Sequence, residues 1–344
     1  MSDHPFVTVI MPTRNEEAFI ERSLGAVLTQ NYPADRMEVI VADGMSDDAT
    51  RDIVRSLQRQ YSNLRLIDNP SGFVPPAMND AIRQARGEIV VRVDGHAVIE
   101  SDYVSTAVAT LQRTGADMVG GPMRPYGDEP IAQSIALATT TRFGIGGGRF
   151  HYAEEESDVD TVYIGTCRRD LYLRMGGFDE EMIRAQDAEL SARIVEQGGR
   201  IVCNPAIRSR YFPRSSFRAL RRQYFWTGYW KVRVLQKHPR RFLRQLVPSI
   251  FVATVLISLL TAPFSAVSRR VLFTVLGAYI AANLTASVAT ARNGNEHLLR
   301  LLPLTFATLH VAHGSGFLYG LLKFCNRWGE QEELQPLQPV SETA

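Results

Sequence analysis

Cysteine is scarce in this sequence, and its three cysteines are not placed as a metal site or a disulfide framework requires. Cys167, Cys203 and Cys325 lie far apart, odd in number and without the CxxC spacing of a metal-binding pair. These absences exclude a zinc-finger module and a small secreted scaffold held by disulfides. A reducing cytosol is the simplest interpretation of this cysteine content.

Two further signals are missing. The N-terminal segment has no basic region followed by an apolar region and a small-residue cleavage site, so nothing in it directs secretion. We therefore expect the soluble part of the chain to remain cytoplasmic. No GxGxxG motif follows the first expected strand, which argues against an oxidoreductase with a dinucleotide-binding fold.

Acidic residues are absent from Arg208 to Arg244, although the whole chain carries a net charge of only +2. This segment combines about a dozen lysines and arginines with aromatic residues such as Tyr224 and Trp226. Such a mixture could grip single-stranded nucleic acid, but here it directly precedes an apolar stretch. Basic residues beside a membrane segment mark its cytoplasmic side and favour anionic lipids by about 1 kcal/mol per charge. We therefore expect an anionic inner leaflet as partner and no nucleic acid.

Apolar, β-branched runs alternate with segments of helical periodicity over the first quarter of the chain. This alternation predicts an α/β fold with a mostly parallel sheet and helices on both faces. Ligands of such sheets bind beyond the carboxyl ends of the strands, where polar residues converge here. Strands are expected at 6–11, 37–42, 64–67 and 88–93, and helices at 16–30, 50–61 and 76–85.

The last third of the chain contains long apolar segments. Residues 246–262 and 271–289 carry no charge, and lengths of roughly 17 to 21 residues are at the lower end for crossing a bilayer. We expect a two-helix membrane hairpin. The stretch 298–322 is interrupted by Arg300, Pro303 and two histidines, so it could span, re-enter or lie at the interface. The polar tail after residue 328 is expected to be disordered.

Three short motifs carry chemistry. Asp43 follows a strand and could accept a hydrogen bond from a nucleobase or ribose, although a purely structural turn remains open. Asp94 and His96 leave a strand end two positions apart, and oxygen and imidazole ligands suit Mn²⁺ or Mg²⁺ bridging a diphosphate. Asp187 begins a helix, where a carboxylate is either an N-cap or a rigidly held general base.

The order of these motifs, from Phe6 to Trp230, closely resembles that of the inverting glycosyltransferases of family 2, which have the GT-A fold. The resemblance implies that Asp187 is the catalytic base and that Asp94 and His96 bind the metal. It also implies a UDP-sugar donor, whose nucleotide would be bound by Pro12, Arg14, Glu16, Asp43, Asn69 and Asp94. On the acceptor side it implies Gly165, Thr166, Arg222 and Trp226.

The sequence departs from the family pattern at three places. His96 replaces the second aspartate of the DxD motif, and Gln186 stands where the family commonly has glutamate before the base. Phe225 replaces the arginine of the Q/RxxRW motif that characterises processive synthases, which favours the addition of a single sugar. The segment from Arg222 to Lys231 is similar to succinoglycan-type exopolysaccharide glucosyltransferases.

This subfamily likeness implies transfer of a hexose, glucose by analogy, to a glycan on a polyprenyl diphosphate during exopolysaccharide synthesis. It also implies a multi-pass protein of the cell inner membrane. Processive polysaccharide synthesis, transfer to a polyprenyl phosphate, a non-catalytic nucleotide-sugar sensor or scaffold, and association with export proteins stay open. We expect a catalytic domain at 1–205, a basic aromatic interfacial segment at 206–245, membrane-associated helices at 246–325 and a polar tail at 326–344.

Overall fold

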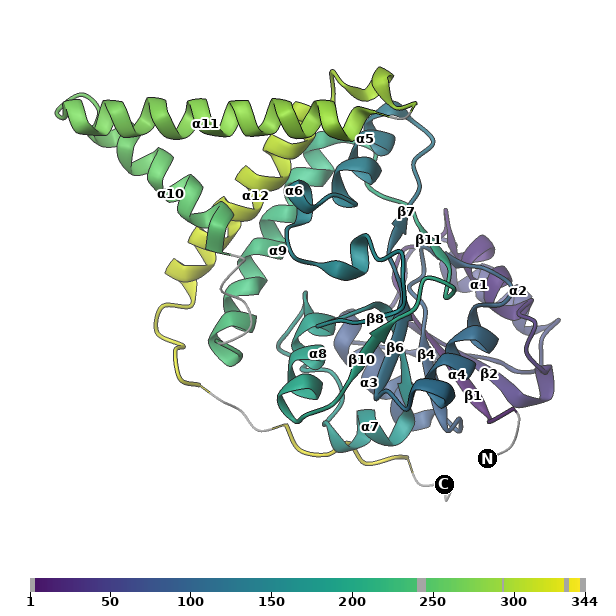
Figure 1. Cartoon of the computed structure of the whole chain (residues 1–344). Coiled ribbons are helices and arrows are strands. Elements are labelled where there is room, and N and C mark those ends of the chain that lie inside the picture. Colours follow the sequence, from purple (N-terminus) through teal and green to yellow (C-terminus); the bar gives the residue numbers. More distant parts are fainter. Residues whose placement is uncertain (1–3, 240–245, 293, 331–333, 341–344) are drawn as a thin grey trace. The chain divides into compact units, whose positions relative to one another are not determined.

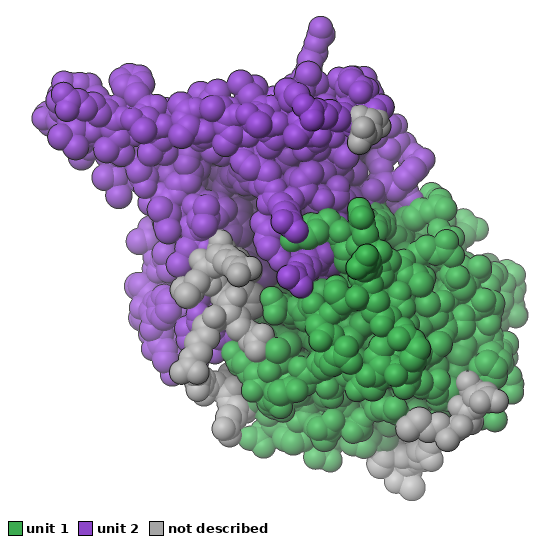
Figure 2. Space-filling view, in the orientation of Figure 1, with its two compact units in different colours: residues 1–124, 152–211, 332–344 green, residues 125–151, 212–331 purple. Residues whose placement is uncertain are grey.

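A computed structural model of the chain describes residues 4–239, 246–292, 294–330 and 334–340. These residues fall into two compact units (Figure 2). The first comprises residues 1–124, 152–211 and 332–344, and the second comprises residues 125–151 and 212–331. The segment 125–151, which lies inside the expected 1–205 domain, is therefore part of the second unit.

The first unit is built on an eight-stranded sheet with the order β3-β2-β1-β4-β9-β6-β10-β8 (Figure 1). Strands β1, β2, β3 and β4 are parallel to one another, and β9 runs antiparallel to both β4 and β6. The expected mostly parallel sheet is confirmed. The strands are β1 (Val7–Thr13), β2 (Met37–Asp43), β3 (Leu64–Asp68), β4 (Ile89–Arg92), β6 (Met118–Gly121), β8 (Ser157–Asp158), β9 (Tyr163–Arg168) and β10 (Ile201–Cys203).

The central strands are apolar because helices pack over them. Every residue of β1 and β2 is buried, as is typical of parallel strands covered on both faces. The register aligns Thr13 with Asp43, and Asp43 with Asp68, so three strand ends lie side by side. The helices of this unit are α1 (Ile20–Leu28), α2 (Thr50–Gln58), α3 (Val74–Gln84), α4 (Tyr103–Thr114), α7 (Arg169–Arg174) and α8 (Gln186–Glu196).

A second, three-stranded sheet has the order β5-β11-β7. Its strands are β5 (Ala97–Ile99), β7 (Arg124–Pro125) and β11 (Ser209–Tyr211). Strand β5 follows the Asp94-Gly95-His96 segment directly, and its antiparallel partner β11 brings Tyr211 opposite Ala97. The turn that carries the predicted metal ligands therefore lies between two sheets.

The second unit is helical. Its helices are α5 (Pro130–Thr139), α6 (Arg142–Ile145), α9 (Phe217–Lys237), α10 (Leu246–Thr261), α11 (Ala266–Ala291) and α12 (Leu302–Lys323). Helices α9 and α12 pack backbone to backbone through glycines. A Cβ at Gly228 would lie 2.1 Å from the carbonyl oxygen of His313, and one at Gly316 would lie 1.9 Å from that of Phe225. Only glycine permits so close a crossing.

Helix α11 is, within the described residues, the one helix long and apolar enough to cross a membrane. Helix α10 is also apolar but has only 16 residues. The expected pair of spans is therefore not supported, and neither is a multi-pass arrangement. Helix α12 covers most of the ambiguous stretch 298–322 and buries Phe306 and Phe317 against other helices of its unit.

The C-terminal tail differs from the expectation of disorder over residues 334–340. This segment belongs to the first unit, where the amide of Leu337 donates to the carbonyl of Leu173 at 2.9 Å. The amide of Val340 donates to the carbonyl of Arg83 at 3.2 Å. A polar composition did not predict this contact because its hydrogen bonds are made by the backbone.

Candidate active site

The loops after β1 and β2 are fastened to each other at the edge of the sheet. The amide of Asn15 donates to Ser46 Oγ at 2.9 Å, and the amide of Glu16 donates to Thr50 Oγ1 at 2.8 Å. Asn15 and Met45 have positive φ angles of 53° and 58°, an unusual conformation for residues other than glycine. Tight strand-end loops at this edge are consistent with the expected donor site.

Asp43 is fully buried and already holds several partners. Its carboxylate accepts hydrogen bonds from the amide and hydroxyl of Ser46, at 2.9 and 2.5 Å, and from Arg51 at 2.6 Å. Arg51 also binds Asp68 at 2.7 Å. A carboxylate has about four acceptor positions, and these contacts occupy three of them on Asp43. Sequence reasoning did not identify Arg51 as the partner of this carboxylate.

Three other residues that were predicted to bind the donor nucleotide lie at the same edge, but they differ in burial and in contacts. Pro12 is buried in β1. Arg14 is exposed and donates to the carbonyl of Gly72 at 3.1 Å. Asn69 is almost completely buried and binds within its own loop, to the carbonyl of Phe73 and the hydroxyl of Ser71. Asn69 therefore shapes the loop, and Arg14 is the residue of these three that faces solvent.

Asp94 forms an ion pair with Arg92, the last residue of β4. The guanidinium contacts Asp94 Oδ1 through Nε at 2.9 Å and through Nη2 at 2.8 Å. Burial opposes the charged form of Arg92, but the attraction of Asp94 and Asp187 raises its pKa above the usual range of arginine. A permanent cation therefore lies among the predicted functional carboxylates, and sequence reasoning missed it.

His96 binds Glu16. Its Nδ1 lies 2.9 Å from Glu16 Oε1, across 80 positions of sequence. The imidazole also meets the ring of Tyr211 edge-on, with centroids 5.9 Å apart, and Tyr211 meets Tyr163 in the same manner. Burial and then the charge of Asp94 raise the pKa of Tyr163 well above 10. The surroundings of His96 are therefore partly aromatic.

The residues at this edge fit a divalent cation. Among the described residues no three carboxylate, imidazole or thiolate side chains form a preformed cage, but cations that bind with substrate phosphates often take only one or two protein ligands. Both contacts of Arg92 fall on Oδ1 of Asp94, and no donor of the described residues hydrogen-bonds to Oδ2. Asp94 and His96 can thus supply one oxygen and one nitrogen ligand.

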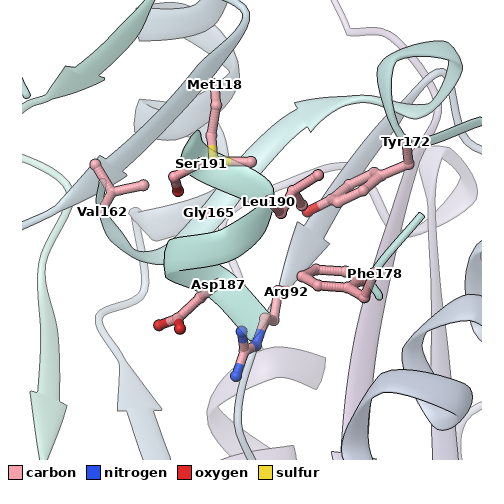
Figure 3. Close-up of a pocket in the computed structure, with 9 residues that line it drawn as sticks. All are labelled: Arg92, Met118, Val162, Gly165, Tyr172, Phe178, Asp187, Leu190 and Ser191. Atoms are coloured by element: carbon pink, nitrogen blue, oxygen red, sulfur yellow. The ribbon is translucent and has the colours of Figure 1, made fainter. Parts of the chain in front are cut away.

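Asp187 lies at the start of α8, as the sequence predicted. The preceding Ala185 adopts the left-handed conformation that turns the chain into the helix. Asp187 is exposed, and its Oδ1 accepts from the amide of Ala188 at 2.8 Å. Figure 3 shows its carboxylate and the guanidinium of Arg92 at the same end of a small pocket. The pocket is lined by Arg92, Met118, Val162, Gly165, Tyr172, Phe178, Asp187, Leu190 and Ser191.

The loop beside this pocket is held from two sides. Asn79 of α3 binds both the amide and the carbonyl of Phe178, at 2.8 and 2.9 Å. Arg193 of α8 donates to the carbonyls of Met175 and Gly177 while pairing with the buried Glu189. Two side chains that do not line the pocket thus fix the part of its wall that Phe178 supplies.

The predicted acceptor-side residues belong to different units. Gly165 and Thr166 lie in β9 of the first unit, where Gly165 lines the pocket of Asp187 and Thr166 is completely buried. Arg222 and Trp226 lie in α9 of the second unit. Arg222 is exposed, and Trp226 packs edge-on against Phe225 and Tyr229. Their role towards an acceptor stays a prediction.

Comparison with known proteins decides the family. Residues 8–172 match the family model described as glycosyl transferase family 2. Succinoglycan biosynthesis protein ExoA of Rhizobium meliloti is 27% identical over 322 residues, which cover 93% of this chain and 96% of ExoA. Residues 8–172 therefore form a glycosyltransferase domain of family 2.

Two further similarities extend over almost the whole of this chain. A dolichyl N-acetyl-α-D-glucosaminyl phosphate 3-β-D-2,3-diacetamido-2,3-dideoxy-β-D-glucuronosyltransferase of Methanococcus voltae is 27% identical over 326 residues, covering 92% of this chain and 98% of that protein. The mannosyltransferase PcManGT of Pyrobaculum calidifontis, solved with GDP-Man and Mn²⁺, superposes with a TM-score of 0.60 at 23% identity. That alignment covers 92% of this chain and 87% of PcManGT, and it supports the GT-A fold.

Proposed function

We propose that this glycosyltransferase transfers one hexose, with inversion, from a UDP-sugar to a lipid-linked glycan. The observation that carries the proposal is the grouping of Asp187, Arg92 and Asp94 in the first unit. Asp187 and Arg92 line one pocket, and Arg92 binds Asp94. A candidate base therefore lies beside the carboxylate that is predicted to serve the donor.

The proposed reaction is a single displacement. Asp187 accepts the proton of an acceptor hydroxyl as its oxygen attacks the anomeric carbon. The new carbon–oxygen bond forms as the bond between that carbon and the diphosphate breaks, and UDP leaves with the electron pair. Arg92 holds Asp94 and presents a positive charge near the pocket, which favours the developing negative charge of the leaving group. A divalent cation held by Asp94 and His96 would neutralise the diphosphate further.

The acceptor is proposed from the relatives. The name of the Methanococcus voltae protein describes transfer to a sugar carried on a dolichyl phosphate, and that of ExoA describes succinoglycan synthesis. We therefore favour a glycan on a polyprenyl diphosphate, with glucose as the transferred hexose by analogy to the succinoglycan-type enzymes.

We also propose attachment to the inner membrane with the catalytic unit on the cytoplasmic side. Helix α11 is long and apolar enough to cross a bilayer, and only 17% of its most apolar window is buried. Phe264 and Phe273 are 90% and 72% exposed, which is costly in water for so large a side chain. The basic helix α9 precedes these apolar helices in sequence and suits anionic headgroups.

The test is transfer by the detergent-solubilised full chain. The protein is incubated with a panel of UDP- and GDP-sugars, Mn²⁺ or Mg²⁺, and lipid extract of the source cell. Nucleotide release and the mass of the lipid fraction are then measured together. The proposal predicts a gain of one hexose from a UDP-sugar. A polymeric product would indicate a processive synthase, and modification of the bare lipid phosphate would indicate a polyprenyl-phosphate transferase.

A further inference from the structure

The contact between His96 and Glu16 determines which nitrogen of the imidazole donates a hydrogen bond and which carries the lone pair. An ionised carboxylate only accepts hydrogen bonds, so Nδ1 of His96 donates to Glu16 Oε1 across 2.9 Å. In the neutral ring, the lone pair then belongs to Nε2. A histidine that donates one N–H to a carboxylate and offers its other nitrogen is the usual arrangement of a metal-binding histidine.

The carboxylate of Glu16 is held in place by its surroundings. The amide of Glu16 donates to Thr50 Oγ1, and its carbonyl accepts from the amides of Phe19 and Ile20 at the start of α1. The side chain reaches His96 over Gly95, where a Cβ would lie 3.1 Å from Glu16 Cγ. The absence of a side chain at position 95 therefore leaves the space through which Glu16 approaches the imidazole.

The turn that carries His96 is fixed as well. The amide of Ala97 donates to the carbonyl of Asp94 at 2.9 Å, and Ser23 Oγ donates to the carbonyl of Gly95 at 2.5 Å. Tyr211 supports the imidazole edge-on. Contacts with the backbone, with a carboxylate and with an aromatic ring thus determine the orientation of the imidazole. A turn histidine that only faces solvent does not require such a set of contacts.

We propose that Glu16 is a positioning residue that orients His96 as a nitrogen ligand, and that the site therefore selects Mn²⁺ over Mg²⁺. Imidazole suits the first-row transition metals, whereas Mg²⁺ prefers oxygen ligands. An aspartate at position 96 would give an all-oxygen set that suits both ions. The replacement of the second DxD aspartate by His96 supplies the nitrogen ligand, and the contact with Glu16 then orients it. This inference rests on the proposed function, since the cation is bound together with the donor diphosphate.

The experiment measures metal binding directly. Binding of Mn²⁺ to the full chain is followed by electron paramagnetic resonance with saturating UDP, and in parallel with GDP, and Mg²⁺ affinity is obtained by competition. Glu16→Ala removes the acceptor and is expected to weaken Mn²⁺ binding about 10- to 100-fold. Glu16→Gln keeps an acceptor and should fall between Glu16→Ala and wild type. Glu21→Ala, which changes an exposed glutamate in the first turn of α1, is the matched control and should bind Mn²⁺ like wild type.

A second variant tests the selectivity. His96→Asp should lower the preference for Mn²⁺ over Mg²⁺, because it exchanges nitrogen for oxygen. The inference is overturned if Glu16→Ala and Glu21→Ala bind Mn²⁺ equally, or if His96→Asp leaves the ratio of the two affinities unchanged. Thermal unfolding of each variant shows whether weaker metal binding comes from the loss of a ligand or from the loss of the fold. If the Mn²⁺ results are as expected but no sugar transfer is ever detected, the proposed function fails and this inference stands.

Discussion

Arg92 is an unusual residue for its position. The rest of β4 is apolar, and the strand lies between β1 and β9 at the centre of the sheet. Its side chain is 11% exposed, and that of Asp94, its partner two residues later, is 18% exposed. A charge this far from water requires a partner, so the ion pair is part of the structure as well as of the candidate site.

Loss of this pair is expected to destabilise the first unit. Removing one partner of a largely buried pair leaves an uncompensated charge, so Arg92→Leu should lower the free energy of unfolding by about 3 kcal/mol. Arg55→Leu is the control, because Arg55 and Asp52 are exposed and such pairs contribute about 0–1 kcal/mol. Urea unfolding measures the free energy of unfolding of both variants. Equal midpoints for the two variants would contradict this account of Arg92.

The positions of the candidate residues in the fold were predictable where they follow from the strand and helix pattern, whereas their roles stay predictions. Asp43, Asp94 and Asp187 lie at strand ends and a helix start, and periodicity locates such points. Arg92 and Arg51 were missed because nothing in one sequence marks a charge in a strand or a helix as functional. The Glu16–His96 contact joins residues 80 positions apart, so it appears only after the sheet brings two loops together.

Secondary structure over the first 95 residues follows from local sequence. Strand β2 begins at Met37, strand β3 at Leu64 and helix α2 at Thr50, as periodicity predicted, and the other bounds differ by a few residues. The tail could not be predicted in this way. Residues 334–340 lie against the first unit through backbone hydrogen bonds, and Leu337 approaches Gly177, whose φ is +70°. Gly177 precedes Phe178, which lines the pocket of Asp187.

The tail contact is expected to steady the loop beside the pocket. Leu337→Ser removes the apolar part of the contact, so the amides of residues 175–178 should exchange hydrogen faster than in wild type. Gln338→Ser, at the adjacent exposed position, is the control. Hydrogen–deuterium exchange of the intact chain measures these exchange rates in both variants. Identical exchange in the two variants would show that the tail does not stabilise this loop.

At the scale of the whole molecule, the sequence predicted that the C-terminal part contains apolar helices. It did not predict which other residues belong to the same unit. The apolar segments were evident from hydropathy. That residues 125–151 belong with the C-terminal helices depends on contacts such as Ser134 with Thr305, whose hydroxyls lie 3.0 Å apart. The glycine-mediated packing of α9 on α12 likewise requires knowledge of which turns of the two helices meet.

Membrane attachment through apolar surface has a distinct salt dependence. We expect the protein to float with vesicles that contain anionic lipid and to remain bound in high salt, because apolar burial is not screened. Phe264→Ser combined with Phe273→Ser should weaken this binding, whereas Phe73→Ser in the first unit should not. Complete release of wild type by salt would show that the basic segment alone makes the attachment.

The central claim is that Asp187 is the base of a glycosyl transfer. The most direct test compares wild type with Asp187→Asn in the donor-panel assay, with nucleotide binding measured on the same samples. The account predicts that the variant folds and binds UDP with Mn²⁺ but no longer adds a hexose to the lipid, since an amide cannot take the proton. Transfer by Asp187→Asn at the wild-type rate would contradict the assignment. Absence of transfer by the wild type with every donor, despite nucleotide binding, would favour a sensor.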